Sequence, residues 1–178
     1  IRDSINPYNI NFTVGNFETV ERIIPSLEKP LNTQFFVLGE NREGADKLLD
    51  HAEIYIDFFT RSFGQYPWLK EKLGIVNTPY LGMEHQTIIA YGNDYKYNDK
   101  GYDFLLFHEL AHEWWGNYLS VSDWADFWIH EGFAIYSEAL FVEEKYGLNE
   151  YNNFFKKNLL KKIPLNRPVV LDRNSTMK

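Results

Sequence analysis

The 178-residue chain contains no cysteine, so it has neither disulfide bonds nor thiolate metal ligands. No apolar run reaches the roughly 20 residues that a membrane-spanning helix needs. Basic residues are also fewer than acidic ones, with 18 Lys and Arg against 25 Asp and Glu, and the net charge is −7. The sequence shows no evident basic surface. The composition therefore argues against a membrane segment and against nucleic acid as a partner.

The one cluster of positive charge is explained by the solvated face of a helix, and its members are Lys156, Lys157, Lys161 and Lys162. The lack of cysteine fits a cytoplasmic protein and equally a bacterial periplasmic one. The chain begins at Ile1 and has no signal peptide, so we expect a piece of a longer protein whose targeting is not visible.

Apolar residues make up 44% of the chain, enough for one domain with a sizeable core. Ile10, Phe12 and Val14 alternate with polar residues, which is typical of a strand. Helical spacing of apolar residues follows over 42–63 and ends at Gly64. Further strands are expected at 33–38, 73–76 and 87–91, with a polar loop over 92–101.

The most informative stretch is His108-Glu109-Leu110-Ala111-His112, which has the H-E-x-x-H pattern of a zinc hydrolase helix. Two histidines four residues apart differ by about 40° around a helix axis, so both imidazoles point the same way. Glu109 lies between them, where its carboxylate can reach a water activated by the metal. Glu131 follows after eighteen residues, and His, His and Glu form a known catalytic zinc set.

A solvated helix that happens to carry two histidines is the alternative to a metal site. The flanks argue against it, because buried His and Glu need partners or a metal. The residues around the motif are large and apolar: Phe104, Leu105, Leu106, Phe107, Leu110, Trp114 and Trp115.

Three helices are expected in the second half of the chain. The motif helix spans about 102–118, and a second helix spans about 124–146, capped by Ser122 or Asp123 and stopped by Gly147. Two antiparallel helices joined by a short loop bring Glu131 back against both histidines. A third helix is expected at 151–162, followed by an irregular tail from Pro164 to Lys178.

These motifs resemble the aminopeptidase N family of zinc metallopeptidases, in the gluzincin clan. The resemblance rests on H-E-L-A-H-E-W-W-G-N at 108–117, on W-I-H-E-G-F-A at 128–134, and on Gly82-Met83-Glu84, which is similar to the family's exopeptidase motif G-x-M-E-N. It covers about residues 33–146. Thermolysin-type endopeptidases are similar but use a gap longer by one residue and lack the exopeptidase element.

The resemblance implies one zinc ion held by His108, His112 and Glu131, with Glu109 as the general base. It implies that Glu84 binds the α-amino group of a peptide substrate, with Gly82 and Met83 beside it. A carboxylate at that place pairs with an ammonium group and selects peptides with a free N-terminus.

Two residues depart from the family pattern, because His85 and His130 stand where it has asparagine. We interpret both as structural or supporting residues, since His130 lies about 100° from Glu131 around the helix. The family's oxyanion-stabilising tyrosine falls some sixty residues after the last zinc ligand, past Lys178.

The resemblance implies an α+β fold, the N-terminal part of a thermolysin-like catalytic domain with a small mixed β-sheet followed by the metal-binding helices. Residues 1–31 are expected to end a preceding β-domain, and 32–178 to form the catalytic portion without its C-terminal part. We expect the 178-residue piece alone to be inactive or nearly so. We also expect apolar helix surface around Phe154 and Phe155 to be exposed.

The leading hypothesis is a zinc-dependent aminopeptidase that hydrolyses the N-terminal peptide bond through zinc-activated water. Two alternatives stay open at this point, a zinc endopeptidase and a non-catalytic interaction domain that keeps the fold. Neither the preferred N-terminal residue nor the oligomeric state follows from the sequence.

Overall fold

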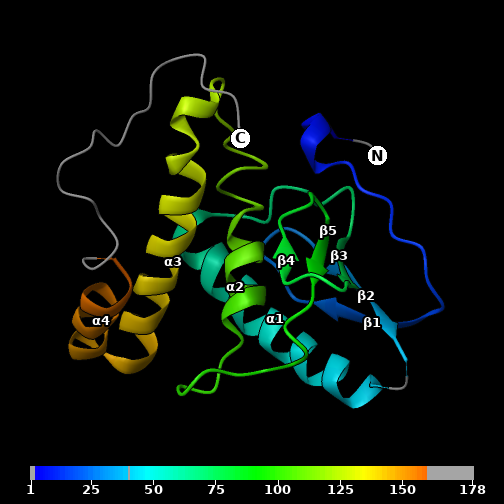
Figure 1. Cartoon of the computed structure of the whole chain (residues 1–178), viewed down its shortest axis with the longest axis horizontal. Helices are drawn as coiled ribbons and strands as arrows, with labels where there is room; N and C mark the ends of the chain where they lie inside the picture. The colour runs from blue at the N-terminus through cyan, green and yellow to red at the C-terminus, as the bar shows by residue number, and fades with distance from the viewer. Residues whose placement is uncertain (1–2, 40, 160–178) are drawn as a thin grey trace.

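The computed structural model describes residues 3–39 and 41–159. A five-stranded sheet and the helices that cover it are arranged side by side (Figure 1). In chain order the elements are the 3₁₀ turn η1 (Pro7–Asn9), β1 (Phe17–Ile24), β2 (Leu31–Leu38), α1 (Arg42–Phe63), β3 (Leu73–Asn77), β4 (Gly82–Met83), β5 (Ile88–Tyr91), α2 (Phe104–Ala111), the 3₁₀ turn η2 (Trp124–Asp126), α3 (Trp128–Tyr146), α4 (Leu148–Phe154) and the π-helical turn η3 (Phe155–Leu159).

The sheet is mixed and has the order β1-β2-β3-β5-β4. Its three central strands β2, β3 and β5 run parallel, and the outer strands β1 and β4 are antiparallel to their neighbours. The first four residues of β3 are all buried, as expected for a central parallel strand covered on both faces. The short strand β4 forms the edge nearest the helices that carry the metal motif.

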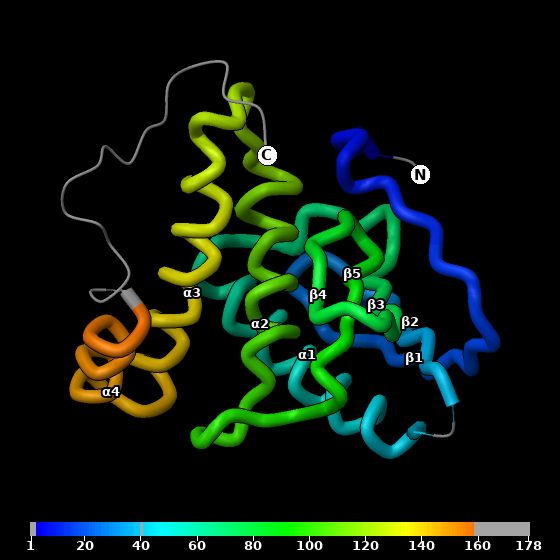
Figure 2. Tube along the Cα trace, viewed as in Figure 1, coloured from blue at the N-terminus to red at the C-terminus, as the bar shows by residue number. Residues whose placement is uncertain are grey.

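Helix α2 lies between the sheet and α3, and α4 packs against the end of α3 (Figures 1 and 2). Helix α2 contacts β4 and β5 on one side and α1 and α3 on the others. The N-terminal segment, blue in both views, runs outside the sheet from β1 to η1. Among the described residues, no helix combines the length and apolar character needed to cross a bilayer.

Aromatic side chains form the core that joins the three large helices. The Phe59 ring of α1 stacks on Trp114 at 4.9 Å between ring centroids and lies 4.8 Å from Phe107 of α2. Phe107 in turn lies 4.9 Å from Phe141 of α3. Aromatic pairs at these separations add to the free energy of burial, so α2 is held rigidly between its neighbours.

Asp103 fixes the start of α2. This fully buried carboxylate accepts a hydrogen bond from the Leu106 backbone N–H at 2.9 Å, as an N-cap residue does. Its carboxylate also accepts bonds from the Tyr91 hydroxyl and from Asn93 Nδ2, the latter at 3.1 Å. Strand β5, its following loop and α2 are therefore tied together through one side chain.

The structure confirms the expected α+β class, a small mixed sheet followed by helices. The first helix spans 42–63 and ends at Gly64, as predicted, and the strands at 31–38, 73–77 and 88–91 agree closely with expectation. Strand β1 pairs with β2 along its whole length, so residues 17–24 belong to the same sheet. The division of the chain into domains at residue 31 stays a prediction.

The strand predicted from Ile10, Phe12 and Val14 is wrong. No strand covers these residues, and their side chains are 50%, 90% and 96% exposed. The first strand begins instead at Phe17, where Val20 and Ile24 enter the core. Alternation alone misled because it records a pattern of side chains and not the partner strand that buries them.

The motif helix is shorter than predicted, because α2 spans only 104–111 and His112 is its C-cap. Beyond it, the backbone N–H groups of Asn117, Tyr118 and Leu119 bond to carbonyls five residues earlier. Gly116 permits this wider winding, since its φ of +134° lies where residues with a side chain are strained.

The other two helices also differ in their bounds. The second begins with η2, whose first turn is capped by Asp123, and α3 proper starts at Trp128, so Glu131 lies in its first turn. The third begins earlier than predicted, at Leu148 directly after Gly147, and continues as η3 to Leu159. The predicted residues 160–162 and the tail from Pro164 lie outside the described residues.

The expected exposure around Phe154 and Phe155 is also wrong. Phe154 is only 9% exposed and belongs to the core, and Phe155 packs against it beside Tyr136 and Tyr151. The short helix α4 folds back onto α3, which covers these rings. Lys156 and Lys157 are exposed, as expected for a solvated face, and Lys161 and Lys162 lie outside the described residues.

Replacing Asp103 with alanine is expected to destabilise the protein by about 3 kcal/mol. The substitution removes a helix cap and leaves buried donors of Tyr91 and Asn93 without their acceptor. Chemical denaturation of the original protein and of Asp103→Ala measures the change in the free energy of unfolding. Asp99→Ala, at an exposed position in the preceding loop, is the control, and equal stability of the two variants would contradict the role given to Asp103.

Candidate metal centre

Helices α2 and α3 bring His108, His112 and Glu131 to one point. The Nε2 atoms of the two histidines lie 3.2 Å apart. Glu131 Oε2 lies 3.3 Å from His108 Nε2, and Glu131 Oε1 lies 3.7 Å from His112 Nε2. The proximity expected from two antiparallel helices is therefore present, with one ligand atom from each residue within 4.8 Å of the others.

The separations between these ligand atoms fit the tetrahedral coordination of a cation. Ligand atoms at the usual zinc distances of about 2.0–2.2 Å in tetrahedral directions are about 3.3 Å from one another. Two imidazole nitrogens facing each other at 3.2 Å also need either a shared proton or a cation between their lone pairs. The donor set and its spacing thus suit zinc.

The backbone orients the His112 ring. Its Nδ1 donates a hydrogen bond to the Trp115 carbonyl at 2.9 Å, which leaves the Nε2 lone pair directed at the other ligands. Trp115 lies just after α2, where the chain begins to wind more widely. Gly116 lies close to both rings, since an added Cβ there would be in van der Waals contact, at 3.4 Å, with His112 Nδ1 and with the His130 ring.

Glu84 and Glu109 form a second group around His112. Ligand atoms of these three residues lie within 4.8 Å of one another, and all three side chains are buried. Gly82 makes room for the arrangement, because a Cβ at this position would lie 2.6 Å from Glu109 Oε1 and 2.7 Å from Leu105 Cδ1. Of the three exopeptidase-motif residues, Gly82 therefore borders Glu109 directly, Met83 ends the edge strand β4, and Glu84 follows that strand.

Burial and like charges shape the electrostatics of the site. Burial raises the pKa of Glu109 to about 8, with Glu84 and Glu131 adding to the increase. The hydrogen bond with His108 lowers the pKa of Glu131. Burial lowers the pKa of His112, and the charge of His108 lowers it further. Such opposed shifts among close neighbours are typical of functional sites.

The two histidines that depart from the family pattern lie beside this centre. Neither contributes a ligand atom to the two groups found among the described residues. His130 is fully buried, and its Nε2 accepts a hydrogen bond from the Val121 backbone N–H at 3.2 Å, which fixes the loop before α3. His85 is 8% exposed and adjoins Glu84 on the segment after β4.

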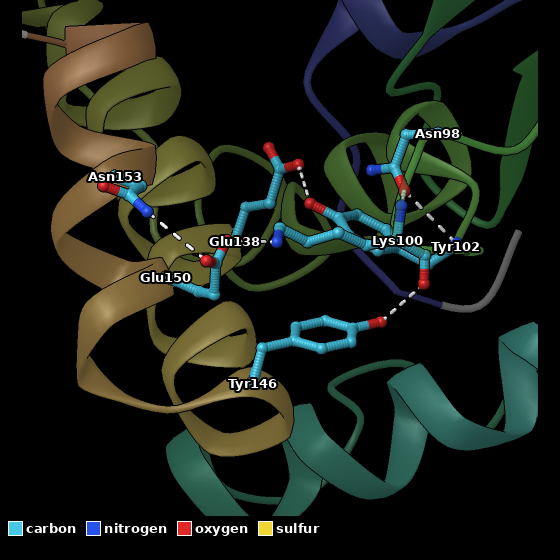
Figure 3. A network of polar contacts seen from close by, with 7 residues as sticks. All are labelled: Asn98, Lys100, Tyr102, Glu138, Tyr146, Glu150 and Asn153. Carbon is cyan, nitrogen blue, oxygen red and sulfur yellow. Dashed lines mark hydrogen bonds and ion pairs between the residues drawn. The ribbon is translucent and has the colours of Figure 1, made fainter.

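A cavity of about 920 Å³ opens beside His108 and Glu109. Leu105 and Ile135 are among the apolar residues that line it, and most residues of the polar network drawn in Figure 3 line it as well. In that network the Tyr102 hydroxyl donates to Glu138 at 2.7 Å, and the Lys100 ammonium pairs with Glu150. The network joins the loop before α2 to α3 and α4, so one wall of the cavity is set by tertiary contacts.

The N-terminal turn closes the other side of the centre, which the sequence analysis did not foresee. The Tyr8 hydroxyl lies 3.5 Å from Glu84 Oε1, and the Tyr8 ring meets Trp124 edge to face at 5.2 Å. Nothing in the local sequence points to Tyr8, which precedes the motif helix by about a hundred residues. The sequence analysis also gave no role to Glu113 and Asn117, although both lie within the motif at residues 108–117.

The comparisons with known proteins agree with this geometry. Residues 48–167, more than half of the chain, match the domain described as Peptidase family M1 domain. The chain belongs to peptidase family M1. The resemblance to the aminopeptidase N family is thereby confirmed.

Within this family, mouse endoplasmic reticulum aminopeptidase 1 is 28% identical over 149 residues, which cover 78% of the chain and 16% of that relative. Transcription initiation factor TFIID subunit 2 of Schizosaccharomyces pombe is 32% identical over 131 residues, which cover 67% of the chain and 11% of that relative. The chain therefore spans less than a fifth of the length of these relatives.

Among solved structures, an M1 zinc metallopeptidase from Deinococcus radiodurans superimposes with a TM-score of 0.65. The match covers 88% of the chain and 35% of that protein, at 22% sequence identity. A likeness at this identity establishes the fold, which is that of an M1 metallopeptidase.

Proposed function

We propose that His108, His112 and Glu131 hold one zinc ion, and that the full-length protein uses it to hydrolyse the N-terminal peptide bond of peptides. The observation that carries the proposal is the convergence of the three side chains, whose nitrogen and carboxylate oxygen atoms approach one another at 3.2–3.7 Å. Relatives named as aminopeptidases and a fold shared with a zinc metallopeptidase support it.

Glu109 is the proposed general base. A zinc ion held by His108, His112 and Glu131 would lower the pKa of water toward neutrality and polarise a carbonyl oxygen. The Glu109 carboxylate would take the proton of the attacking water, and the resulting carboxylic acid would deliver it to the leaving amine. The burial of Glu109 raises its pKa above that of an exposed carboxyl, which makes its carboxylate a stronger proton acceptor.

Glu84 is the proposed anchor of the substrate's α-amino group. Its buried carboxylate stands within 4.8 Å of ligand atoms of Glu109 and His112, a separation short enough to restrict an anchored amine to the residue next to the scissile bond. Strand β4 lies at the edge of the sheet, where Gly82 and Met83 offer backbone groups to an extended peptide. The anchor and the edge strand together favour cleavage next to a free N-terminus.

Two other functions compete with this proposal. A zinc endopeptidase would use the same metal and base without an amine anchor, and the buried Glu84 argues against it. A non-catalytic interaction domain is the second, because the TFIID subunit among the relatives does not bear the name of a peptidase. The presence of all three ligand residues together with Glu109 favours catalysis in this chain.

The protein is expected to bind one zinc ion, and His112→Ala is expected to weaken binding by more than about 100-fold. Losing a ligand costs at least as much as losing the supporting bonds around it, which typically cost 10–100-fold. His130→Ala is the matched control and should retain the metal within about tenfold. Metal analysis and competition with a chelator measure both, and full zinc occupancy in His112→Ala would refute the ligand assignment.

In the full-length protein, Glu109→Gln should keep its zinc while kcat falls by about 10²–10⁴-fold. An amide cannot accept the proton of the attacking water, whereas the metal ligands are untouched. Glu53→Gln, on the exposed face of α1, is the control and should leave kcat unchanged. A variant at position 109 with normal turnover would mean that another group acts as the base.

Peptides with a free N-terminus should be cleaved, and their N-acetylated forms should not. Glu84→Gln should reduce kcat/KM for the free peptides by about 10–100-fold, the usual worth of a hydrogen-bonded charge pair. Rates on paired free and acetylated substrates measure the preference. Efficient cleavage of the acetylated peptides would favour the endopeptidase alternative.

A further inference from the structure

Three buried polar residues connect the metal helix, the segment that carries Glu84 and the N-terminal turn. They are Asn9, Glu113 and Asn117, and we call them the Asn117 bridge. Their exposed fractions are 1%, 0% and 9%. Buried polar side chains are costly unless they are bonded, so the contacts of these three residues reveal what they hold in place.

Asn117 stands at the centre of the bridge. Its side-chain Nδ2 donates to the Glu84 carbonyl at 2.9 Å and to Glu113 Oε2 at 3.4 Å. Its Oδ1 accepts a hydrogen bond from Asn9 Nδ2. Its backbone N–H donates to the His112 carbonyl at 2.9 Å. One residue thus joins the backbone of a proposed zinc ligand to the backbone of the proposed amine anchor.

Glu113 holds the same segment at a second point. Its Oε1 accepts a hydrogen bond from the Thr87 backbone N–H at 2.8 Å. Thr87 has a φ of +61°, a left-handed conformation that a β-branched residue adopts only when its surroundings impose it. The turn that follows Glu84 is therefore held against its own preference by a carboxylate from the end of the metal helix.

We propose that Asn117 and Glu113 are positioning residues that set the distance between the Glu84 carboxylate and the metal ligands, with Asn9 supporting Asn117. The inference rests on the proposed function, in which Glu84 binds the substrate's α-amino group. Glu84 lies on a segment after the edge strand β4, whose two residues give it little support of their own. The bridge supplies that support from the helix that carries His108 and His112.

This arrangement links the amine anchor to the metal through one rigid unit. A peptide is cut one residue from its N-terminus only if the ammonium site and the reacting centre keep a fixed separation. Shifts of about 1 Å in such a separation cost up to 100-fold in rate. The bridge is expected to act on recognition of the amine and not on binding of the metal.

The test uses two probes on the zinc-loaded full-length protein, leucine hydroxamate and N-acetyl-leucine hydroxamate. Both offer the same group to zinc, and only the first carries an ammonium group. Calorimetry gives the ratio of their dissociation constants, which we call the amine advantage. Asn117→Ala should lower the amine advantage by about tenfold and leave the affinity for the acetylated probe within about twofold.

Glu113 offers a matched pair of variants. Glu113→Gln keeps an oxygen that can accept from the Thr87 N–H, so the amine advantage should stay within about threefold of the original. Glu113→Ala removes that acceptor and should reproduce the loss seen in Asn117→Ala. A purely structural role would lower thermal stability in these variants without changing the ratio between the two probes.

An unchanged amine advantage in Asn117→Ala at full zinc occupancy would overturn the proposal. If that variant does not fold, Asn9→Ala is the milder substitute, expected to lower the ratio by about two- to fivefold. An unchanged ratio in both Asn9→Ala and Glu113→Ala would then overturn it. Failure of the unsubstituted protein to bind either probe, or equal binding of both, would instead overturn the proposed function and this inference with it.

Discussion

The concentration of charge between α2 and α3 is the constraint on which the rest of the structure depends. His112 belongs to two groups of close ligand atoms, one with His108 and Glu131 and the other with Glu84 and Glu109. Like charges repel at such separations, and burial penalises each charged form. A cation shared among the nitrogen and oxygen atoms compensates both costs, which is why the proposed zinc accounts for the composition of the site.

The fold meets this constraint by fixing the backbone around the site from several sides. Aromatic rings of α1, α2 and α3 hold the metal helix against its neighbours, and Asp103 fixes where that helix begins. Where α2 ends, the chain winds more widely, so that the Trp115 carbonyl reaches His112 and Asn117 reaches Glu84. The irregular end of the helix is thus the part that organises the site.

Local sequence signals predicted the regular elements well and the irregular ones poorly. Helix α1 follows from apolar spacing with Gly64 at its end, because a single amphipathic face determines it. The length of α2 did not follow, since Trp114 and Trp115 continue the apolar pattern and only the hydrogen bonds to carbonyls five residues back end the helix. The strand predicted from Ile10, Phe12 and Val14 was wrong because no neighbouring strand covers these exposed residues.

The sequence by itself determined the candidate residues and the family resemblance: the spacing of His108, Glu109, His112 and Glu131, and the Gly82-Met83-Glu84 element before them. Side-chain type and helical period are local properties, so a motif can record them. Only the tertiary structure decided that Tyr8 contacts Glu84, that Asn9 bonds to Asn117, and that Asn117 links the proposed anchor to the segment after α2. Those contacts join residues up to 108 positions apart, and long-range hydrogen bonds leave no periodic trace in a chain.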